Sequence, residues 1–325
     1  MVTGASAGIG RATAVELALR GWDVGLLARG EAGLEGARRE VEAQGRRALV
    51  VRCDVSVADE VEAAAARVEA ELGPIDAWVN NAMATIFAPF DEVDPEEFRR
   101  TIEVTLLGFV HGTQAALRRM KPRDRGAIVQ VGSALAYRGI PLQSAYCASK
   151  FAIRGFTESL RAELLHAGSG VHVTEVHLPG LNTPQFDQVR TKLPGLPRPV
   201  PPVFQPEVAA RAIAHAVEHP RRRAMWVGGF NVAVIVGSRL VPWVADRYLA
   251  RTNVDAQQAE ERATAERQAT DYLFAPLPGD QGAHGRFGDE AKARSYQAIL
   301  TRHRAAAAGT LAAAAAGAAA LARTR

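Results

Sequence analysis

Three side chains in the middle of the sequence have the types and spacing of a proton-transfer site. Tyr146 and Lys150 are four residues apart, so on a helix they share one face, and Ser133 precedes Tyr146 by 13 residues. A phenol alone is a poor acid at neutral pH because its ordinary pKa is about 10. A neighbouring ammonium group favours the phenolate and lowers that pKa, while a serine hydroxyl can hold the same substrate oxygen. The pattern predicts a tyrosine that protonates a carbonyl oxygen, or takes the proton in the reverse direction.

A tyrosine and a lysine at this spacing are common on helices, so the interpretation depends on the N-terminus. Residues 3–10 read TGASAGIG, with Gly4, Gly8 and Gly10 between an expected strand and an expected helix. Glycines let a backbone approach a ligand closely, and a helix N-terminus supplies N–H groups and the positive end of a dipole. The alternative is a tight turn without a ligand. A second apolar strand candidate at residues 23–28 favours a pyrophosphate-binding turn.

The first expected strand is unusually short. It ends at Thr3, and three residues of strand span only about 10 Å. We expect either a truncated central strand or a true start several codons upstream of Met1.

Strand and helix patterns alternate from residue 1 to residue 229, including one long helix expected over residues 94–120. This alternation predicts an α/β fold with a doubly wound, Rossmann-type parallel sheet and helices on both faces. Ligands of such sheets bind at the carboxyl ends of the strands. The candidates that directly follow predicted strands are Gly4–Gly10, Arg29, Asp54, Asn80, Ser133 and Pro179.

Over residues 1–229 the sequence resembles the short-chain dehydrogenase/reductase family. The motifs that carry the resemblance are TGASAGIG (3–10), CDV (53–55), NNA (80–82), the Ser133, Tyr146 and Lys150 set, and PGLNT (179–183). The resemblance implies an NAD(P)-dependent oxidoreductase that transfers a hydride between its cofactor and a small carbonyl or alcohol substrate. It also implies a homodimer or homotetramer that pairs through the helix carrying the Tyr/Lys motif and its successor.

The resemblance implies a role for each matching residue. Tyr146 would be the general acid or base, Ser133 would orient the substrate oxygen, and Lys150 would lower the pKa of Tyr146 and bind the nicotinamide ribose. Asp54 would bind the adenine amino group, and Asn80 would lie against the adenosine ribose. The remaining cofactor-binding residues would be Gly4, Ser6, Gly8, Ile9, Gly10, Arg29, Pro179, Gly180 and Thr183.

The residues after the second strand bear on the choice of cofactor. NAD enzymes of this fold usually place a carboxylate there for the ribose 2′-hydroxyl. Here the place holds Ala28 and Arg29, and a guanidinium can pair with a 2′-phosphate through two hydrogen bonds. The sequence therefore favours NADP over NAD. The alternative is that Arg29 is a solvated turn residue.

Two positions depart from the family pattern. Thr105 stands where relatives usually carry an asparagine that holds a water linked to the lysine, and Met83 follows NNA where glycine is usual. The threonine puts the proton relay in question, and the methionine predicts a bulkier loop over the cofactor.

The composition excludes several other classes. Hydrophobic residues make up 48% of the 325 residues, charged residues 23%, and the net charge is +4, as in ordinary soluble proteins. No basic run with interleaved aromatic residues indicates a nucleic-acid surface. Two cysteines, Cys53 and Cys147, are too few for a disulfide framework. With no metal-ligand pattern and no signal peptide, we expect a cytoplasmic protein without a metal site.

Residues 181–205 are rich in proline and would form a lid over the substrate. The alternative is a loop that packs its own prolines. Its apolar residues favour a hydrophobic substrate; they are Leu181, Phe186, Leu193, Leu196 and Phe204.

Residues 230–325 form a C-terminal extension that has no counterpart in the family core. We expect it to pack on the domain or on a partner subunit, with a polar helix over 255–270 and a loop over 276–289. Residues 305–322 are almost all alanine, which predicts a helix. Because alanine adds little hydrophobic drive, a loosely attached helix is favoured over membrane contact.

The main prediction is an NADP-preferring oxidoreductase with Tyr146 as acid or base. One alternative is a catalytically weak dinucleotide-binding protein that acts through a partner, as Thr105 suggests. Another is a membrane-associated reductase of lipid carbonyls, which rests on residues 305–322.

Overall fold

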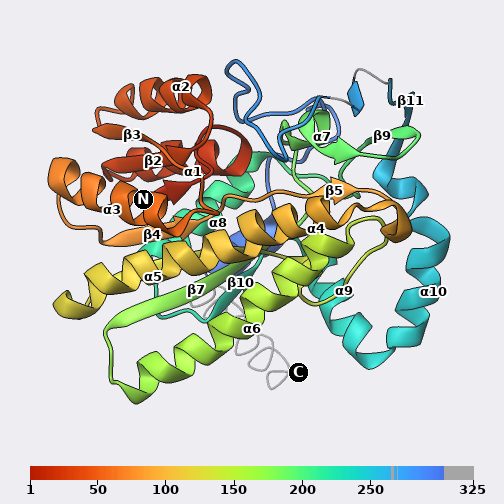
Figure 1. Ribbon diagram of the computed structural model, residues 1–325. Helices are drawn as coiled ribbons and strands as arrows, with labels where there is room; N and C mark the ends of the chain where they lie inside the picture. Colours follow the sequence, from red (N-terminus) through yellow and green to blue (C-terminus); the bar gives the residue numbers. More distant parts are fainter. Residues whose placement is uncertain (265–266, 269, 304–325) are drawn as a thin grey trace, which may run out of the picture.

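A seven-stranded sheet forms the centre of the computed structural model, which describes residues 1–264, 267–268 and 270–303 (Figure 1). The strand order is β10-β7-β6-β4-β1-β2-β3, and each pair of neighbours is parallel. The chain therefore starts at the centre and adds strands outward on both sides, which confirms the doubly wound Rossmann-type sheet. The strands are β1 (Val2–Thr3), β2 (Val24–Ala28), β3 (Ala48–Arg52), β4 (Ala77–Asn80), β6 (Gly126–Ser133), β7 (Val171–Leu178) and β10 (Ala224–Trp226).

Helices cover both faces of this sheet, as predicted (Figure 1). Helices α1, α2 and α8 pack on one face, and α3, α5 and α6 pack on the other. Each face has its own buried apolar cluster, because strands of a parallel sheet present apolar side chains to both sides. The helices are α1 (Gly8–Leu19), α2 (Glu31–Glu42), α3 (Ala58–Leu72), α4 (Pro95–Ile102), α5 (Gly108–Met120), α6 (Ser144–His166) and α8 (Pro206–Glu218).

The first strand is as short as the sequence predicts. β1 has two residues, both buried, and pairs with β2 on one side and β4 on the other. Its position inside the sheet, between β4 and β2, places the glycine turn that follows it within the carboxyl edge.

The long helix expected over residues 94–120 has a different shape in its middle. It begins with Asp94 and Glu97 in a capping box and Pro95 in the first turn. A π-helical turn over Glu103–Leu107 then separates α4 from α5. Such turns are rare and frequently lie at functional sites.

The segment expected to form a lid, residues 181–205, is built from short elements. It contains α7 (Gln185–Gln188), β8 (Arg190–Thr191) and β9 (Gly195–Pro197). Strand β8 pairs with β5 (Ile86–Phe87), which follows the NNA motif. The pairing ties the lid to the loop on the opposite side of the carboxyl edge.

The C-terminal extension packs on the rest of the same chain. Helix α9 (Gly229–Leu240) packs on the short turn Ala134–Ala136 between β6 and α6, α10 (Pro242–Thr252) packs on α9, and α12 (Tyr296–Arg302) packs on α8 (Figure 1). The loop expected over 276–289 is confirmed. Residues 305–322, where a helix was expected, lie outside the described residues.

The prediction of a helix over 255–270 is wrong for most of the segment that the structure describes. A short 3-10 turn, Asp255–Gln257, is followed by strand β11 (Gln258–Arg262), which pairs with β9 in antiparallel fashion. The backbone groups on the edge of β9 pair with those of β11, although the two strands are far apart in the sequence. Tertiary pairing of this kind overrides a weak local helix preference.

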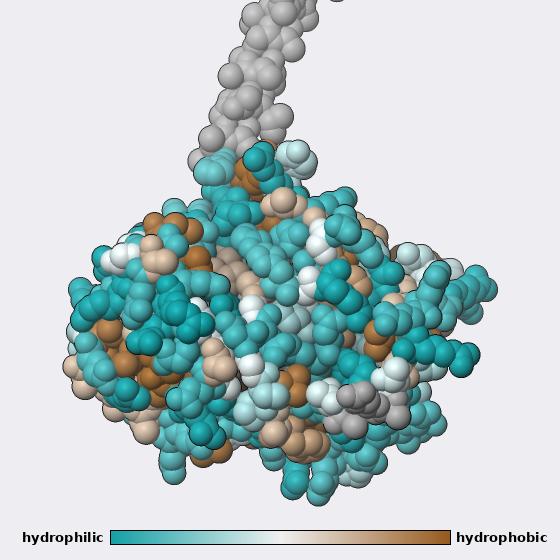
Figure 2. Space-filling view, turned by 90° about the horizontal axis from the view of Figure 1, so that it is seen from above, coloured by the Kyte–Doolittle hydropathy of each residue, from teal (hydrophilic) through white to brown (hydrophobic). Residues whose placement is uncertain are grey.

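The exterior is mostly hydrophilic where Figure 2 shows it, and hydrophobic residues gather there only in small separate groups. None of the helices within residues 1–264, 267–268 and 270–303 combines the length and hydropathy that a bilayer crossing needs.

Two helix glycines differ sharply in their surroundings. A Cβ added to Gly112 in α5 would lie 2.2 Å from Asn80 Oδ1, whereas one on Gly155 in α6 would meet nothing within 4 Å. We predict that Gly112→Ala lowers the free energy of unfolding by about 1–3 kcal/mol through overpacking. The matched change Gly155→Ala should raise it by up to about 1 kcal/mol, because alanine is the better helix former. Urea denaturation of the two variants measures both effects; equal midpoints would contradict the prediction.

Candidate active site

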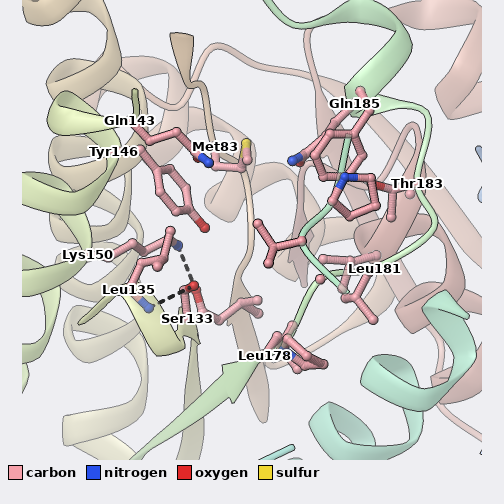
Figure 3. Close-up of a pocket in the computed structure, with 18 of the residues that line it drawn as sticks. Met83, Ser133, Leu135, Gln143, Tyr146, Lys150, Leu178, Leu181, Thr183 and Gln185 are labelled. Atoms are coloured by element: carbon pink, nitrogen blue, oxygen red, sulfur yellow. Dashed lines mark hydrogen bonds between the residues drawn. The ribbon is translucent and has the colours of Figure 1, made fainter. Parts of the chain in front are cut away.

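The carboxyl edge of the sheet brings together Ser133, Tyr146 and Lys150. Ser133 ends β6, while Tyr146 and Lys150 occupy the first two turns of α6. Figure 3 shows the Tyr146 hydroxyl pointing into a gap, with Ser133 beside it and Leu181, Thr183 and Gln185 on the far side. All three residues line one cleft of about 770 Å³. The Tyr146 phenol and the Ser133 hydroxyl therefore both face the space of the cleft.

Burial decides the ionisation of this pair. Lys150 is only 2% exposed, and its Nζ donates a hydrogen bond of 2.8 Å to the Val131 carbonyl oxygen. Burial lowers the pKa of Lys150 to about 7. Burial also raises the pKa of Tyr146, and the Ser133 side chain offsets this only in part.

The direction for Tyr146 is opposite to the one expected from the Tyr/Lys spacing. The lysine nitrogen lies 5.4 Å from the centre of the tyrosine ring and bonds a backbone carbonyl instead. Desolvation therefore shifts both pKa values toward the neutral forms of the two groups.

The glycine turn forms the floor of the same cleft. Gly4 and Gly8 have φ angles of 67° and 55°, in the left-handed region that favours glycine. A Cβ on Gly10 would lie 2.1 Å from the Gly4 carbonyl oxygen, so helix α1 packs directly on the turn. Gly10 lies beneath the surface, whereas the turn residues that line the cleft are Gly4, Ser6, Ala7, Gly8 and Ile9.

Charged residues line the wall that follows β2 and β3. Asp54 Oδ2 accepts a bond of 2.6 Å from Arg100, and its Oδ1 accepts one of 2.8 Å from the Ser56 hydroxyl. Burial alone would raise the pKa of Asp54, but these hydrogen bonds leave it lowered. Arg29 also lines the cleft, so it is not the solvated turn residue of the alternative interpretation.

The guanidinium of Arg29 has partners that the sequence did not predict. It donates to the backbone carbonyls of Tyr272, Leu273 and Phe274 in the C-terminal extension. Burial lowers its pKa, while Asp54 opposes that change.

Asn80, which was expected against the adenosine ribose, does not line the cleft. It is fully buried, where its amide donates to Gln130 at 2.9 Å and to Thr113 at 3.1 Å, and its Oδ1 accepts from Trp78 at 2.8 Å. The neighbouring Asn81 lines the cleft instead. Successive residues at a strand end point to opposite sides, and the sequence motif did not say which asparagine faces the ligand.

The Thr105 hydroxyl does not face the cleft, because it is hydrogen-bonded to the backbone of Ala84. It lies fully buried in the π-helical turn, accepts a bond of 2.9 Å from Ala84 N and donates one of 2.7 Å to Ala84 O. Its side chain therefore fixes the loop after NNA rather than a water beside Lys150. Met83 lines the cleft, as a bulkier loop predicts.

The segment after β7 closes the opposite side. Pro179, Gly180 and Thr183 all line the cleft. Thr183 faces the glycine turn, because a Cβ on Gly8 would lie 3.3 Å from the Thr183 Cβ. Of the apolar lid residues, Leu181 and Phe186 line the cleft. Leu193 and Phe204 are buried in the core clusters instead.

The C-terminal extension forms a wall of the cleft that the sequence did not predict. Helices α9 and α10 add a largely apolar surface, and the apolar run at 232–236 was the only local signal for it. The residues of α9 and α10 that line the cleft include Phe230, Val234, Val244, Tyr248 and Leu249, and Val241 between the two helices joins them.

Metal chemistry has no support among the residues that the structure describes. Within them, no group of three or more His, Cys, Asp or Glu side chains is arranged to hold an ion. Both cysteines are buried free thiols.

Comparisons with known proteins agree with the geometry. The family model described as short chain dehydrogenase matches residues 1–194. The uncharacterized oxidoreductase YxnA of Bacillus subtilis is 32% identical over 322 residues, which is 98% of this chain and 89% of that protein. The 3-dehydrosphinganine reductase of Danio rerio is 36% identical over 198 residues, 59% of each protein.

A solved structure extends the comparison to the fold. It is an alcohol dehydrogenase from the archaeon Thermococcus sibiricus, complexed with 5-hydroxy-NADP. It is 29% identical, has a TM-score of 0.61, and the match covers 70% of this chain and 94% of that one. This chain belongs to the short-chain dehydrogenase/reductase family and is an NAD(P)-dependent oxidoreductase.

Proposed function

We propose that the protein interconverts a carbonyl compound and its alcohol with NADP(H), and that Tyr146 is the general acid or base. The observation that carries the proposal is the shared cleft: the Tyr146 and Ser133 hydroxyls open into the same space as the glycine turn. A substrate oxygen placed beside Tyr146 would also lie within reach of Ser133.

The residues fit a dinucleotide. Two glycines with positive φ and a third in contact with the turn let a ligand approach the backbone closely at the N-terminus of α1. Gly4, Ser6, Gly8 and Ile9 would hold the pyrophosphate, with Gly10 supporting them. Asp54 and Arg29 would flank the adenosine, and Pro179, Gly180 and Thr183 would flank the nicotinamide. The bound nicotinamide would supply or accept the hydride.

The chain's own groups account for the proton. In reduction, the Tyr146 O–H donates its proton to the carbonyl oxygen as that oxygen gains charge, and Ser133 donates a hydrogen bond to the same oxygen. The lowered pKa of Lys150, about 7, lets its amine take up or release a proton near neutral pH. Because the Thr105 hydroxyl bonds the backbone of Ala84, proton exchange would depend on Lys150 rather than on Thr105.

Charge and shape support finer points of the proposal. The residue directly after β2 is Arg29 rather than a carboxylate, and Arg29 lines the cleft, which favours the 2′-phosphate of NADP. The neighbouring alcohol dehydrogenase structure also holds an NADP derivative. The apolar wall of α9 and α10 favours a substrate with a hydrophobic part.

We also propose self-association through α6. Phe151 and Leu165 on this helix are 44% and 81% exposed, so α6 presents large apolar side chains to water. Burial against a second copy would remove that surface from water.

Removal of the Tyr146 hydroxyl tests the chemistry. We predict that Tyr146→Phe lowers kcat about 10²- to 10⁴-fold on a panel of ketones and aldehydes, while NADPH binding stays intact. Tyr296→Phe, a change at a 76% exposed residue outside the cleft, is the matched control. Bound cofactor with equally slow turnover in wild type and Tyr146→Phe would favour the catalytically weak binding protein instead.

The ionisation of Lys150 should appear in the pH dependence of stability. Its pKa falls from 10.5 to about 7 on folding, so between these values the unfolded state binds more protons. The free energy of unfolding of wild type should therefore rise between pH 7 and 10, relative to Lys150→Met. Urea midpoints of both proteins at several pH values measure the difference. If the difference in unfolding free energy between wild type and Lys150→Met does not change with pH, folding does not lower the pKa of Lys150.

Arg29 should set the cofactor preference. We predict that Arg29→Asp weakens binding of NADPH at least tenfold more than binding of NADH. The new carboxylate repels a 2′-phosphate, whereas it accepts a hydrogen bond from a 2′-hydroxyl. Fluorescence titration with both cofactors gives the ratio. An unchanged ratio would remove Arg29 from the choice.

A further inference from the structure

One segment of the extension crosses the cleft above the glycine turn. Residues 271–282, which we call the strap, run through the loop at the top of Figure 1. Five of its residues line the cleft together with the glycine turn: Tyr272, Pro276, Leu277, Gly279 and Gln281. The strap lies outside residues 1–194, the part that matches the family.

The first end of the strap is fixed at the Asp54 wall. Arg29 donates to the Phe274 carbonyl oxygen at 3.0 Å, and Arg100 donates to that of Leu273 at 3.2 Å. The Leu273 side chain is fully buried in the apolar cluster on that face of the sheet. Polar and apolar contacts together hold this end.

The other end is fixed on helix α1. Gly8 N, at the start of the helix, donates to the Gly282 carbonyl oxygen at 3.0 Å. Asp280 pairs with the buried guanidinium of Arg11, and Gln188 of α7 donates to Gln281 at 2.7 Å. The strap is therefore attached on both sides of the glycine turn.

The strap spans the cleft without filling it. About 770 Å³ remains, bounded by the strap on one side and the glycine turn on the other, which is within the range of ligand pockets. The strap also gives Arg29 neutral carbonyl oxygens, so its positive charge stays available to an anionic group in the cleft.

We propose that the strap is a wall of the dinucleotide site that closes over the bound cofactor, so that NADPH enters and leaves only when the strap detaches. The inference rests on the proposed function, since it takes the cleft to be the cofactor site. The adenosine half would lie between Gly4–Ile9 and the strap. Release from either anchor would open that half to solvent.

A disulfide can hold the strap closed. A Cβ on Gly30 would lie 3.6 Å from the Pro276 Cβ, within the range that disulfides span, and Gly30 has a φ of −88° that any residue adopts. The experiment is the double variant Gly30→Cys with Pro276→Cys, with each single variant as control. The native thiols are buried, and burial raises the pKa of Cys53 to about 12, so they react poorly.

NADPH fluorescence gives both exchange rates without any turnover. Protein oxidised after loading should release NADPH at least tenfold more slowly than its reduced form, and protein oxidised while empty should take up NADPH at least tenfold more slowly. Equal rates in the oxidised and reduced forms, with the disulfide verified by mass spectrometry, would overturn the strap's role. If neither NADPH nor NADH binds wild type or the reduced variant, the proposed function itself fails and the inference falls with it.

A second pair of variants covers the case in which the cysteine protein does not fold. Arg11 pairs with two carboxylates, Asp280 of the strap and Glu40 of α2. Asp280→Asn should speed NADPH release about three- to tenfold, because it weakens one anchor. Glu40→Gln removes the other partner of the same guanidinium and should leave the rate unchanged. Equal effects of the two changes, or none from Asp280→Asn, would contradict the inference.

Discussion

The whole site depends on the close contact between the glycine turn and the loop after β4. Thr3, the last residue of β1, accepts hydrogen bonds at its Oγ1 from Asn81 N at 2.9 Å and from Ala82 N at 3.0 Å. A Cβ on Gly4 would lie 2.9 Å from both Ala82 Cα and Asn81 Nδ2. Only a glycine lets the two backbones meet there, and this meeting sets where the floor of the cleft lies relative to the sheet edge. Strand β1 has only two residues, and the Thr3 side chain adds hydrogen bonds to the loop after β4 beyond those of its backbone.

Desolvation controls the chemistry of this edge. Lys150 is almost completely enclosed, and the enclosure lowers its pKa, while the same lack of water raises the pKa of Tyr146. Enclosure therefore favours the neutral form of each group, a tyrosine that still carries its proton and a lysine that titrates near neutrality. A phenol in this state suits the direction in which it donates a proton to a substrate oxygen. Any group that enters the cleft and brings charge or hydrogen bonds to this pair would change the balance.

The extension changes what the core can do. Helices α9 and α10 add an apolar wall to the cleft, and the strap adds a wall above the glycine turn. Both come from the part of the chain beyond the family match, yet the similarity to YxnA runs over 98% of the chain. The family core thus supplies Ser133, Tyr146, Lys150 and the glycine turn, and the extension adds further walls to their cleft. Enclosure of this kind strengthens every charge interaction inside the cleft because it removes competing water.

The local pattern of the sequence was enough for the sheet, its two layers of helices, the glycine turn and the meeting of Ser133, Tyr146 and Lys150. Each of these follows from periodicity or from residues within one strand–turn–helix unit, and the parallel order then brings the strand ends together. The sequence could not show that β11 forms on the edge of β9, that Asn81 rather than Asn80 faces the cleft, or that Arg29 meets residues more than 240 positions away. Nor could it show which way the pKa of Tyr146 moves, because spacing reveals the neighbour but not the burial. Those outcomes depend on contacts between distant segments and on the exclusion of water, and both exist only once the chain has folded.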